Sequence, residues 1–339
     1  MKRVNIAVVG CGFIATTAHI PNILSIAEAK LVGLCDSDAT KLQDACNNFN
    51  IDRNHSHSDV NELLSRSDIE AVVLCTPTPT HANIGMKILE TGKHLFVEKP
   101  IAQTSSEAEA LVRTATQQDL KLMVGHFMGF LPNHIKSRDL IRNGTIGKVF
   151  YAEVHSETLV IKEDEGMLLD YSAHSVDLMR WYFDDARIDR VAALLQKTEE
   201  EDNAESHANI ILQFSNGVVG HIGNFYVPGF KNWDAVDRSI RILGTKGKIV
   251  TEYTTPPITV YKAGTLIGRV RGPQTIVPKF VMHPRVPLSQ TSYRKEIEDF
   301  IDSIIHNRPP SITGDNALTV LRVLEAAKQS FEKNTFVEV

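Results

Sequence analysis

Cysteine is scarce in this sequence, and its placement argues against a disulfide framework. The 339 residues include four cysteines, all in the first quarter of the chain and none in a C-x-x-C motif. They fall at the ends of predicted strands or on a predicted helix: Cys11, Cys35, Cys46 and Cys75. Reduced thiols of this kind are typical of a cytoplasmic protein.

Long apolar runs and blocks of one charge are missing too. No run approaches the roughly 20 apolar residues that a membrane-spanning helix needs. The formal net charge is −5 and the 36 basic residues are scattered, which argues against nucleic acid or an anionic membrane as the main partner. The pair His55-x-His57 has no further ligands at metal spacing, so no metal site is expected.

The apolar residues that the chain does have suffice for two cores. Hydrophobic residues make up 42% of a length that is too great for one ordinary domain. In the first third, short apolar runs such as residues 4–9 and 71–75 alternate with helical patterns. This alternation predicts an α/β fold, a Rossmann-type doubly wound parallel sheet with helices on both faces. We expect this first domain to cover residues 1–124.

The sequence pattern changes after Gly125. Strand patterns dominate, with helices predicted over residues 132–142, 169–183, 292–306 and 316–332. Residues 125–339 are therefore predicted to form an α+β domain with a large, mostly antiparallel open sheet and closing C-terminal helices. The stretch from Pro256 to Pro287 is rich in proline and glycine and is predicted to be a long excursion.

A glycine turn follows the first predicted strand. Its residues are Gly10, Cys11, Gly12, Phe13, Ile14 and Ala15. The first glycine permits a tight turn, the second lets the backbone approach a pyrophosphate, and the small third residue lets helix and strand pack closely. The positive end of the following helix favours the phosphate charge. The turn predicts a dinucleotide site; a tight turn without a ligand is the alternative.

An acidic residue, Asp36, ends the second predicted strand. A dinucleotide fold places there the carboxylate that accepts hydrogen bonds from the ribose hydroxyls. The same carboxylate would repel a 2′-phosphate, and the nearest cation in the sequence is Lys41 rather than an arginine. The sequence therefore favours NAD over NADP. The alternative for Asp36 is the N-cap of the next helix, a position that Ser37 or Asp38 could also fill.

Two later strand ends belong to the predicted nicotinamide side. Thr76 and Pro77 begin a rigid loop at the crevice where doubly wound sheets bind ligands, and His81 follows in the same loop. His81 is expected near the nicotinamide, or alternatively bonded to backbone at a helix start. Lys99 follows a further strand, and its ammonium could hold a substrate oxygen and help to move a proton as hydride leaves the neighbouring carbon.

Over nearly its full length the chain resembles the glucose–fructose oxidoreductase and inositol dehydrogenase family, called Gfo/Idh/MocA. The resemblance is carried by the glycine turn, Thr76-Pro77 with His81, the triplet Glu98-Lys99-Pro100, and a downstream Asp-x-x-x-His, here Asp170 and His174. It implies that Lys99 contacts substrate and cofactor and that Glu98 lies in the cofactor site. It also implies that Asp170 and His174 stand across the nicotinamide as positioning and proton-transfer groups.

The spacing of Asp170 and His174 puts both side chains on one helix face. Asp170 can orient the imidazole or hold a substrate hydroxyl, and His174 can exchange the alcohol proton. The three catalytic candidates are therefore Lys99, Asp170 and His174. The alternative for the pair is an N-capping aspartate and a core-facing histidine.

The chain also departs from the family pattern at two positions. Ser172 stands where a glycine often follows the aspartate, and Gly129 stands in place of an arginine that many members carry after the last Rossmann strand. If that arginine binds anionic or sugar groups elsewhere, this pocket must do so differently. His126, which leaves the sheet at the same edge, is the further substrate contact that we expect.

Together these residues predict an NAD(H)-dependent oxidoreductase acting on a secondary hydroxyl or carbonyl of a small polyol: a sugar, a cyclitol or a derivative. A same-fold reductase of a dihydrodiol, an imine or a biliverdin-like substrate is one alternative, and a dinucleotide-binding regulator without turnover is another. An open antiparallel sheet face usually needs covering, so we expect a homodimer or homotetramer built on the C-terminal sheet.

Overall fold

The computed structural model describes residues 2–162, 165–198, 204–228, 236–252, 258–262, 270–271 and 292–339. The chain divides into two compact units, Met1–Phe127 with Pro287–Thr319 and Met128–Val286 with Val320–Val339. Helix α9 (Ser292–Ile305), which we expected in the second domain, lies in the first unit. The division into domains at 1–124 and 125–339 stays a prediction.

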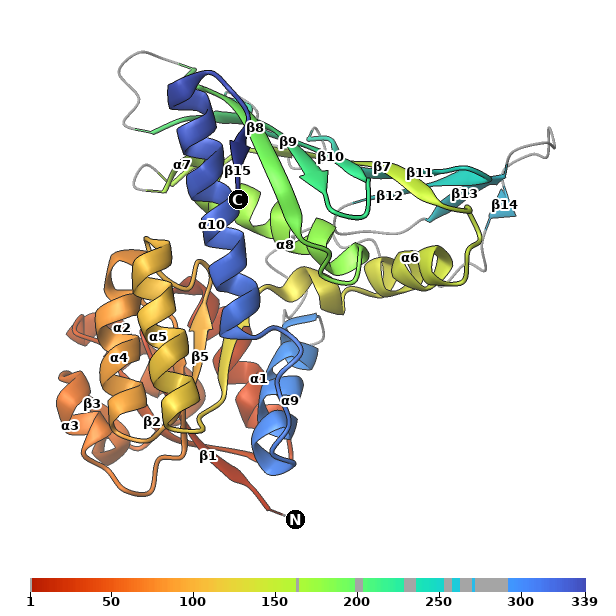
Figure 1. Cartoon of the computed structure of the whole chain (residues 1–339). Helices are drawn as coiled ribbons and strands as arrows, with labels where there is room; N and C mark the ends of the chain where they lie inside the picture. The colour runs from red at the N-terminus through yellow and green to blue at the C-terminus, as the bar shows by residue number, and fades with distance from the viewer. Residues whose placement is uncertain are drawn as a thin grey trace. The chain divides into compact units, whose positions relative to one another are not determined.

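The first unit is built on a six-stranded parallel sheet with the strand order β3-β2-β1-β4-β5-β6 (Figure 1). The strands are β1 (Val4–Val9), β2 (Ala29–Cys35), β3 (Ser56–His57), β4 (Ala71–Leu74), β5 (His94–Glu98) and β6 (Leu122–Gly125). The helical segments besides α9 are η1 (Ala15–His19), α1 (Ile20–Ser25), α2 (Ala39–Phe49), η2 (Arg53–His55), α3 (Val60–Leu64), η3 (Thr78–Thr80), α4 (His81–Glu90) and α5 (Ser105–Gln117). This is the predicted doubly wound sheet.

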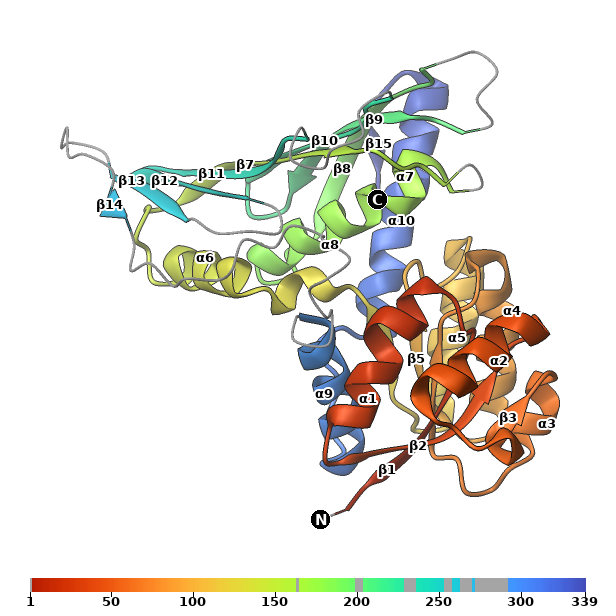
Figure 2. The same ribbon diagram turned by 180° about the vertical axis from the view of Figure 1, so that it is seen from behind.

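The apolar strands of this sheet are buried because helices cover both of its faces. Every residue of β4 is fully buried, as are Val4 and residues 6–8 of β1. Helices α4 and α5 pack against each other on one side, and α1 lies next to α9 on the other (Figure 2). Since the strands are parallel, the residues that follow them meet at one edge of the sheet, where such folds bind ligands.

The second unit contains a nine-stranded sheet with the order β14-β13-β12-β11-β7-β10-β9-β8-β15. Its strands are β7 (Val149–Thr158), β8 (Ile188–Gln196), β9 (His207–Phe214), β10 (Val219–Tyr226), β11 (Arg238–Gly244), β12 (Gly247–Glu252), β13 (Thr259–Lys262), β14 (Val270–Arg271) and β15 (Val337–Glu338). Neighbouring strands are antiparallel except β7 and β10, which run parallel. The predicted fold class, a Rossmann sheet plus a mostly antiparallel sheet, is confirmed.

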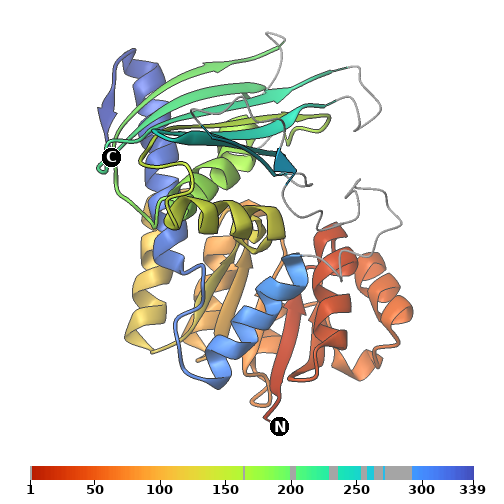
Figure 3. The same ribbon diagram turned by 90° about the vertical axis from the view of Figure 1, so that its right-hand side faces the viewer.

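Helices cover one face of this second sheet (Figure 3). They are α6 (Pro132–Arg142), α7 (Gly166–Asp170) and α8 (Ser172–Tyr182), while η4 (Phe127–Phe130) precedes them and α10 (Gly314–Lys333) ends in this unit. Strand β9 has the expected period of two: Ala208, Ile210, Leu212 and Phe214 are buried, whereas Ile211 is exposed. The opposite face therefore carries exposed side chains.

Three features differ from the sequence-based expectations. The single helix predicted over residues 169–183 is two helices, α7 and α8, with a turn at Tyr171 between them. The short strands β3 and β12–β15 were not predicted, because runs of two to six residues leave little periodic signal. The predicted excursion from Pro256 to Pro287 lies largely outside the described residues; its described parts form β13 and β14.

Membrane insertion through a helix finds no support in the described ranges, where no helix is both long enough and apolar enough to cross a bilayer.

Candidate active site

The glycine turn after β1 has two positions with different requirements. Gly10 has φ +91°, and a Cβ there would lie 2.7 Å from the carbonyl carbon and oxygen of Cys75. A side chain at Gly10 would thus overlap the backbone that follows β4. At Gly12, by contrast, a Cβ would meet no atom of the described chain within 4 Å. The second glycine therefore leaves open the backbone that a dinucleotide approaches.

Asp36 is anchored to this turn by its carboxylate. Oδ2 accepts a hydrogen bond from the backbone N–H of Cys11 at 2.7 Å, and Oδ1 accepts one from the N–H of Asp38 at 2.8 Å. The N-cap of α2 is Asp38, whose side chain accepts from the N–H groups of Thr40 and Lys41. Asp36 is therefore not the helix cap that we considered as its alternative, and its carboxylate stands beside the turn.

The helical segment after the turn begins with η1. Its N-cap residue is Ile14, whose side chain makes no capping hydrogen bond. Phe13 is 73% exposed, the highest value for a large apolar side chain in the described structure. Both residues follow the open position at Gly12. Their predicted contact with a cofactor stays a prediction.

The loop after β4 is tied to the loop after β5 by His81. The His81 ring is buried, with Nδ1 2.8 Å from the carbonyl oxygen of Pro100 and Nε2 2.7 Å from that of Thr76. Of the two roles considered for His81, the contacts of its ring with backbone carbonyls match the second, a histidine bonded to backbone at a helix start. Thr76 also contacts Thr80 through their hydroxyls at 2.7 Å, and Pro77 precedes η3. His81 therefore braces the loop that carries Thr76 and Pro77.

Glu98 ends β5, and half-buried Lys99 follows it. Glu98 Oε1 lies 2.6 Å from Nε2 of His19, and Oε2 accepts a 3.2 Å hydrogen bond from the Lys99 backbone N–H. Burial would raise the pKa of Glu98, but the hydrogen bond and charge of His19, with the charge of Lys99, hold that pKa below its usual range. His19 was not among the predicted site residues, because its signal in the sequence is merely a histidine on an apolar helix face.

His126 follows β6, in the same unit, and is 1% exposed. Its backbone N–H donates to the carbonyl of Val124 at 2.8 Å. The residue before it, Gly125, lies against Glu98, since a Cβ there would be 3.1 Å from Oε2. The carboxyl ends of β5 and β6 are thus packed together, and the predicted substrate contact of His126 stays a prediction.

Asp170 and His174 belong to the second unit, on either side of the turn at Tyr171. Asp170 is the last residue of α7 and buried, while His174 lies in the first turn of α8 and is half-buried. The single continuous helix that we expected is therefore wrong, because the helix is interrupted between the two residues. Tyr171 keeps right-handed helical dihedrals and contacts the hydroxyl of Thr158.

Lys162 is a further charged residue beside Asp170 that sequence reasoning did not identify. Its Nζ lies 3.4 Å from Asp170 Oδ1 and 3.0 Å from Glu165 Oε1. Burial alone would lower the pKa of Lys162, but the two carboxylates raise it. Asp170 therefore has a charged ammonium as neighbour. No spacing rule would have found this pair, since the residues lie eight positions apart in the sequence.

The two departures from the family pattern have local structural reasons. A Cβ at Gly129 would lie 3.2 Å from Nε1 of Trp181, so the indole occupies the space beside this position. Ser172 is buried, where it donates a hydrogen bond to the carbonyl of Met167 at 3.1 Å and accepts one from Asn224 Nδ2 at 2.8 Å. Both residues are therefore matched to neighbours within the second unit.

Asp177, on α8, should make stability depend on pH. Burial, with a smaller contribution from Asp185, raises the pKa of Asp177 to about 7 against the opposing charge of Arg180. Between about pH 4 and 7 the folded protein then holds a proton that the unfolded chain releases, so stability falls as pH rises through that window and levels off above it. Asp177→Asn should remove up to about 4 kcal/mol of this loss at pH 8.

The measurement is thermal unfolding of wild type and Asp177→Asn between pH 5 and 8. The variant should have the higher Tm at pH 8 and a flatter profile. Parallel profiles would mean that Asp177 is ionised in the folded protein.

Comparisons with known proteins cover both units. The model of the GFO_IDH_MocA oxidoreductase family, NAD-binding Rossmann fold, matches residues 4–126, and the model of its C-terminal alpha/beta domain matches residues 138–339. Myo-inositol 2-dehydrogenase of Thermotoga maritima is 24% identical, over 98% of this chain and 98% of that protein. The scyllo-inositol 2-dehydrogenase (NAD(+)) of Bacillus subtilis is 25% identical, over 99% and 96%.

A solved structure has the same fold. It is an oxidoreductase from Agrobacterium radiobacter in complex with NAD+, L-tartaric acid and magnesium. It matches with a TM-score of 0.85 at 20% identity, over 99% of this chain and 98% of that one. The family models together cover the Rossmann unit and most of the rest of the sequence, so the expected resemblance is confirmed: the chain belongs to the Gfo/Idh/MocA family of oxidoreductases.

Proposed function

We propose that this oxidoreductase is an NAD-dependent dehydrogenase that moves a hydride between the nicotinamide and a secondary hydroxyl of a sugar, cyclitol or related polyol. The observation that carries the cofactor assignment is the Asp36 carboxylate, held 2.7 Å from the N–H of Cys11 in the glycine turn. The substrate class is supported by relatives named as inositol dehydrogenases.

The proposed catalytic roles follow from residue chemistry. Lys99 polarises the reacting oxygen, His174 takes the hydroxyl proton during oxidation, and Asp170 orients the histidine or a substrate hydroxyl. Bound NAD accepts the hydride. Lys99 belongs to the first unit and the other two residues to the second. His126 is the further proposed substrate contact.

The proposed cofactor contacts all lie in the first unit. They are Gly10, Gly12, Phe13, Ile14, Asp36, Thr76, Pro77, His81, Glu98 and Lys99. They lie in the glycine turn and its helix start, or at or just after the carboxyl ends of β2, β4 and β5, except His81, which begins α4. That edge is the one at which doubly wound sheets bind dinucleotides.

A turnover screen tests the proposal. Purified protein is mixed with NAD or NADP and with myo-inositol, scyllo-inositol, aldoses or nucleotide sugars, and reduced cofactor is followed by absorbance. We expect NADH formation with at least one polyol. NADH binding without turnover of any polyol would refute the dehydrogenase proposal and favour a regulator, whereas turnover confined to a dihydrodiol or an imine would refute the substrate class.

NAD should be preferred over NADP because a 2′-phosphate would meet the anchored Asp36 carboxylate. Asp36→Ala should lower the ratio of kcat/KM with NAD to that with NADP by about 10- to 100-fold, the effect of removing one nearby repulsive charge in a partly desolvated site. Asp38→Ala is the matched control, since it removes the next carboxylate and the α2 cap but leaves Asp36. Wild-type protein that is more efficient with NADP would overturn the assignment.

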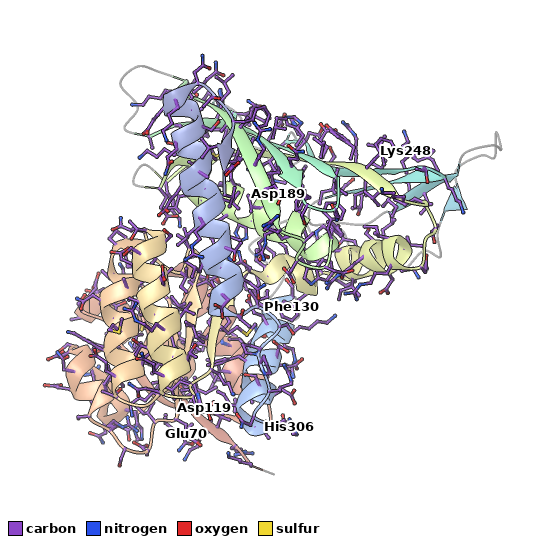
Figure 4. The ribbon with its side chains drawn as sticks, in the orientation of Figure 1. Glu70, Asp119, Phe130, Asp189, Lys248 and His306 are labelled. Carbon is purple, nitrogen blue, oxygen red and sulfur yellow. The ribbon has the colours of Figure 1, made fainter. Side chains whose placement is uncertain are left out.

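We propose that the face of the nine-stranded sheet opposite α6, α7 and α8 binds a second copy of the chain. Three apolar side chains are exposed on this face: Leu194, Ile211 and Val219. In the strand register His221 stands between Ile211 on β9 and Glu153 on β7, so charged or polar groups lie next to the apolar ones. Exposed Lys248 lies in the same sheet (Figure 4). This mixture of apolar and charged groups is typical of a non-obligate or homodimeric interface.

Ile211→Lys should break this association. Size exclusion with light scattering should give two or four chain masses for the wild type and one for the variant, because the ammonium would be buried without a partner. Phe331→Lys is the control, since Phe331 is exposed on α10 rather than on the sheet. A wild-type protein of one chain mass would contradict the proposal.

We infer a cytoplasmic location from the thiols. All four cysteines are buried and unpaired with one another. Burial, followed by the charge of Asp36, raises the pKa of both Cys11 and Cys35 to about 12. These two thiols are therefore protonated. The lack of a disulfide among the four cysteines is what is typical of a reducing compartment.

A further inference from the structure

A histidine–carboxylate pair joins His19 to half-buried Glu98, the residue before Lys99, in the first unit. The His19 side chain is fully buried, and its Nε2 is 2.6 Å from Oε1 of Glu98, a length typical of a charge-assisted hydrogen bond. The ring is also held from the side, edge-on to Phe96 with centroids 5.2 Å apart and to Tyr293 at 6.1 Å. His19 therefore has little freedom to turn away from the carboxylate.

The Glu98 carboxylate has two polar contacts and lies beside Gly125. One oxygen contacts His19, and the other accepts the backbone N–H of Lys99 at 3.2 Å. On the neighbouring strand, a Cβ at Gly125 would lie 3.1–3.2 Å from three atoms of the carboxylate, so even a methyl group would press on it. The carboxylate is thus the link between the helix after the glycine turn and the residue that follows β5.

We propose that His19 is a positioning residue for Lys99. By holding Glu98, it fixes the point at which Lys99 leaves β5 and keeps a carboxylate beside that residue. It also couples this point to η1, the helix that starts at the cofactor turn. The inference rests on the proposed function of Lys99 as the group that polarises the reacting oxygen.

A purely structural role for His19 is the competing explanation. Glu296, on α9, is also fully buried, and the charges of Glu98 and Glu296 raise the pKa of the Cys75 thiol in addition to the larger effect of burial. His19 could simply offset this negative charge. Its loss would then lower stability without a specific change at Lys99, and a stability measurement alone would not separate the two roles.

Asn22 offers a matched control for His19. It lies three residues later, on α1, is fully buried, and its side-chain amide has no hydrogen-bond partner among the described residues. Asn22→Ala therefore removes a buried polar side chain from the same helical segment without touching Glu98. His19→Gln is the conservative variant, because a glutamine amide can still donate to the carboxylate.

Exchange of the Lys99 backbone N–H with deuterium measures the positioning directly and needs no substrate. The protein is labelled with ¹⁵N-lysine, and the Lys99 signal is assigned by its loss in Lys99→Arg. We expect His19→Ala to speed this exchange about 10-fold or more, the factor for losing a hydrogen bond to a charged group. Asn22→Ala should leave the rate unchanged, and His19→Gln should restore most of the protection.

Gly125→Ala keeps the test decisive if His19→Ala does not fold. It presses on the Glu98 carboxylate from the β6 side while His19 stays in place. We expect the same faster exchange at Lys99. If Lys99 exchanges in His19→Ala or Gly125→Ala as it does in Asn22→Ala, the positioning role is wrong.

Kinetics with a polyol from the screen extend the test to catalysis. His19→Ala should lower kcat about 100-fold, as expected when a reacting group is misplaced by ~1 Å, and leave the Kd for NADH nearly unchanged. A loss of NADH affinity with kcat retained would overturn the role. If wild-type protein oxidises no polyol, the proposed function fails, while the exchange data still decide whether His19 positions Lys99.

Discussion

Replacing Lys99 with alanine should lower kcat by about 100- to 10,000-fold, the range that a single positioned acid–base group contributes. NADH binding should change much less than kcat, because most of the proposed contacts with the dinucleotide, including the glycine turn and Asp36, follow other strands. Lys99 is half-buried after β5, with its backbone N–H bonded to Glu98. Initial rates with a polyol and a fluorescence titration with NADH measure the two quantities separately.

Lys30→Ala is the matched control for this experiment. Lys30 is exposed near the start of β2, at the opposite end of that strand from Asp36. Its replacement removes the same positive charge as Lys99→Ala. It should change neither kcat nor the Kd for NADH. A Lys99→Ala protein that binds NADH normally and keeps most of its activity would make Lys99 structural and leave His174 as the remaining candidate for handling the proton.

The parts of the site that the sequence predicted are local in the chain. A buried strand, a glycine turn and a helix occupy consecutive residues, so a short stretch specifies the turn at Gly10 and Gly12. The carboxylate at Asp36 could be placed because parallel strands of a doubly wound sheet end at one edge. The same rule placed Thr76 and Lys99 at that edge. In the structure β4 ends at Leu74 and β5 at Glu98, just before these two residues.

The parts that the sequence did not predict depend on pairs brought together by folding. His19 and Glu98 are 79 positions apart, and no periodicity links them. His81 contacts the carbonyl of Pro100 across 19 positions. Lys162 lies beside Asp170, and Gly129 faces Trp181 of a later helix. A sequence pattern identifies the strand or helix that carries such a residue, but its partner is set by how those elements pack.

The break at Tyr171 shows a different limit. A spacing of four residues puts two side chains on one face only if the helix is continuous. Here α7 begins where Glu205 accepts the N–H of Leu168 at 2.9 Å, and α8 begins with Ser172, which is bonded to Asn224. These bonds to strands and loops favour two short helices over one long helix, although the residues themselves permit either.

Alanine at Gly10 and at Gly12 should have opposite consequences. Gly10→Ala should lower stability by about 2–5 kcal/mol, because a side chain at φ +91° is strained and its Cβ would overlap the backbone of Cys75 at 2.7 Å. This corresponds to a fall in Tm of roughly 5–15 °C. Thermal unfolding followed by circular dichroism measures the effect.

Gly12→Ala should instead leave Tm nearly unchanged, because its Cβ would meet nothing within 4 Å of the described chain. It should raise the Kd for NADH by about 10-fold or more, since the methyl group would hold a phosphate away from the backbone N–H groups and cost a charge-assisted hydrogen bond. The two variants add the same group two residues apart, so each serves as the control for the other. Equal losses of stability would mean that both glycines serve only the turn, whereas normal NADH binding in Gly12→Ala would place the pyrophosphate elsewhere on the protein.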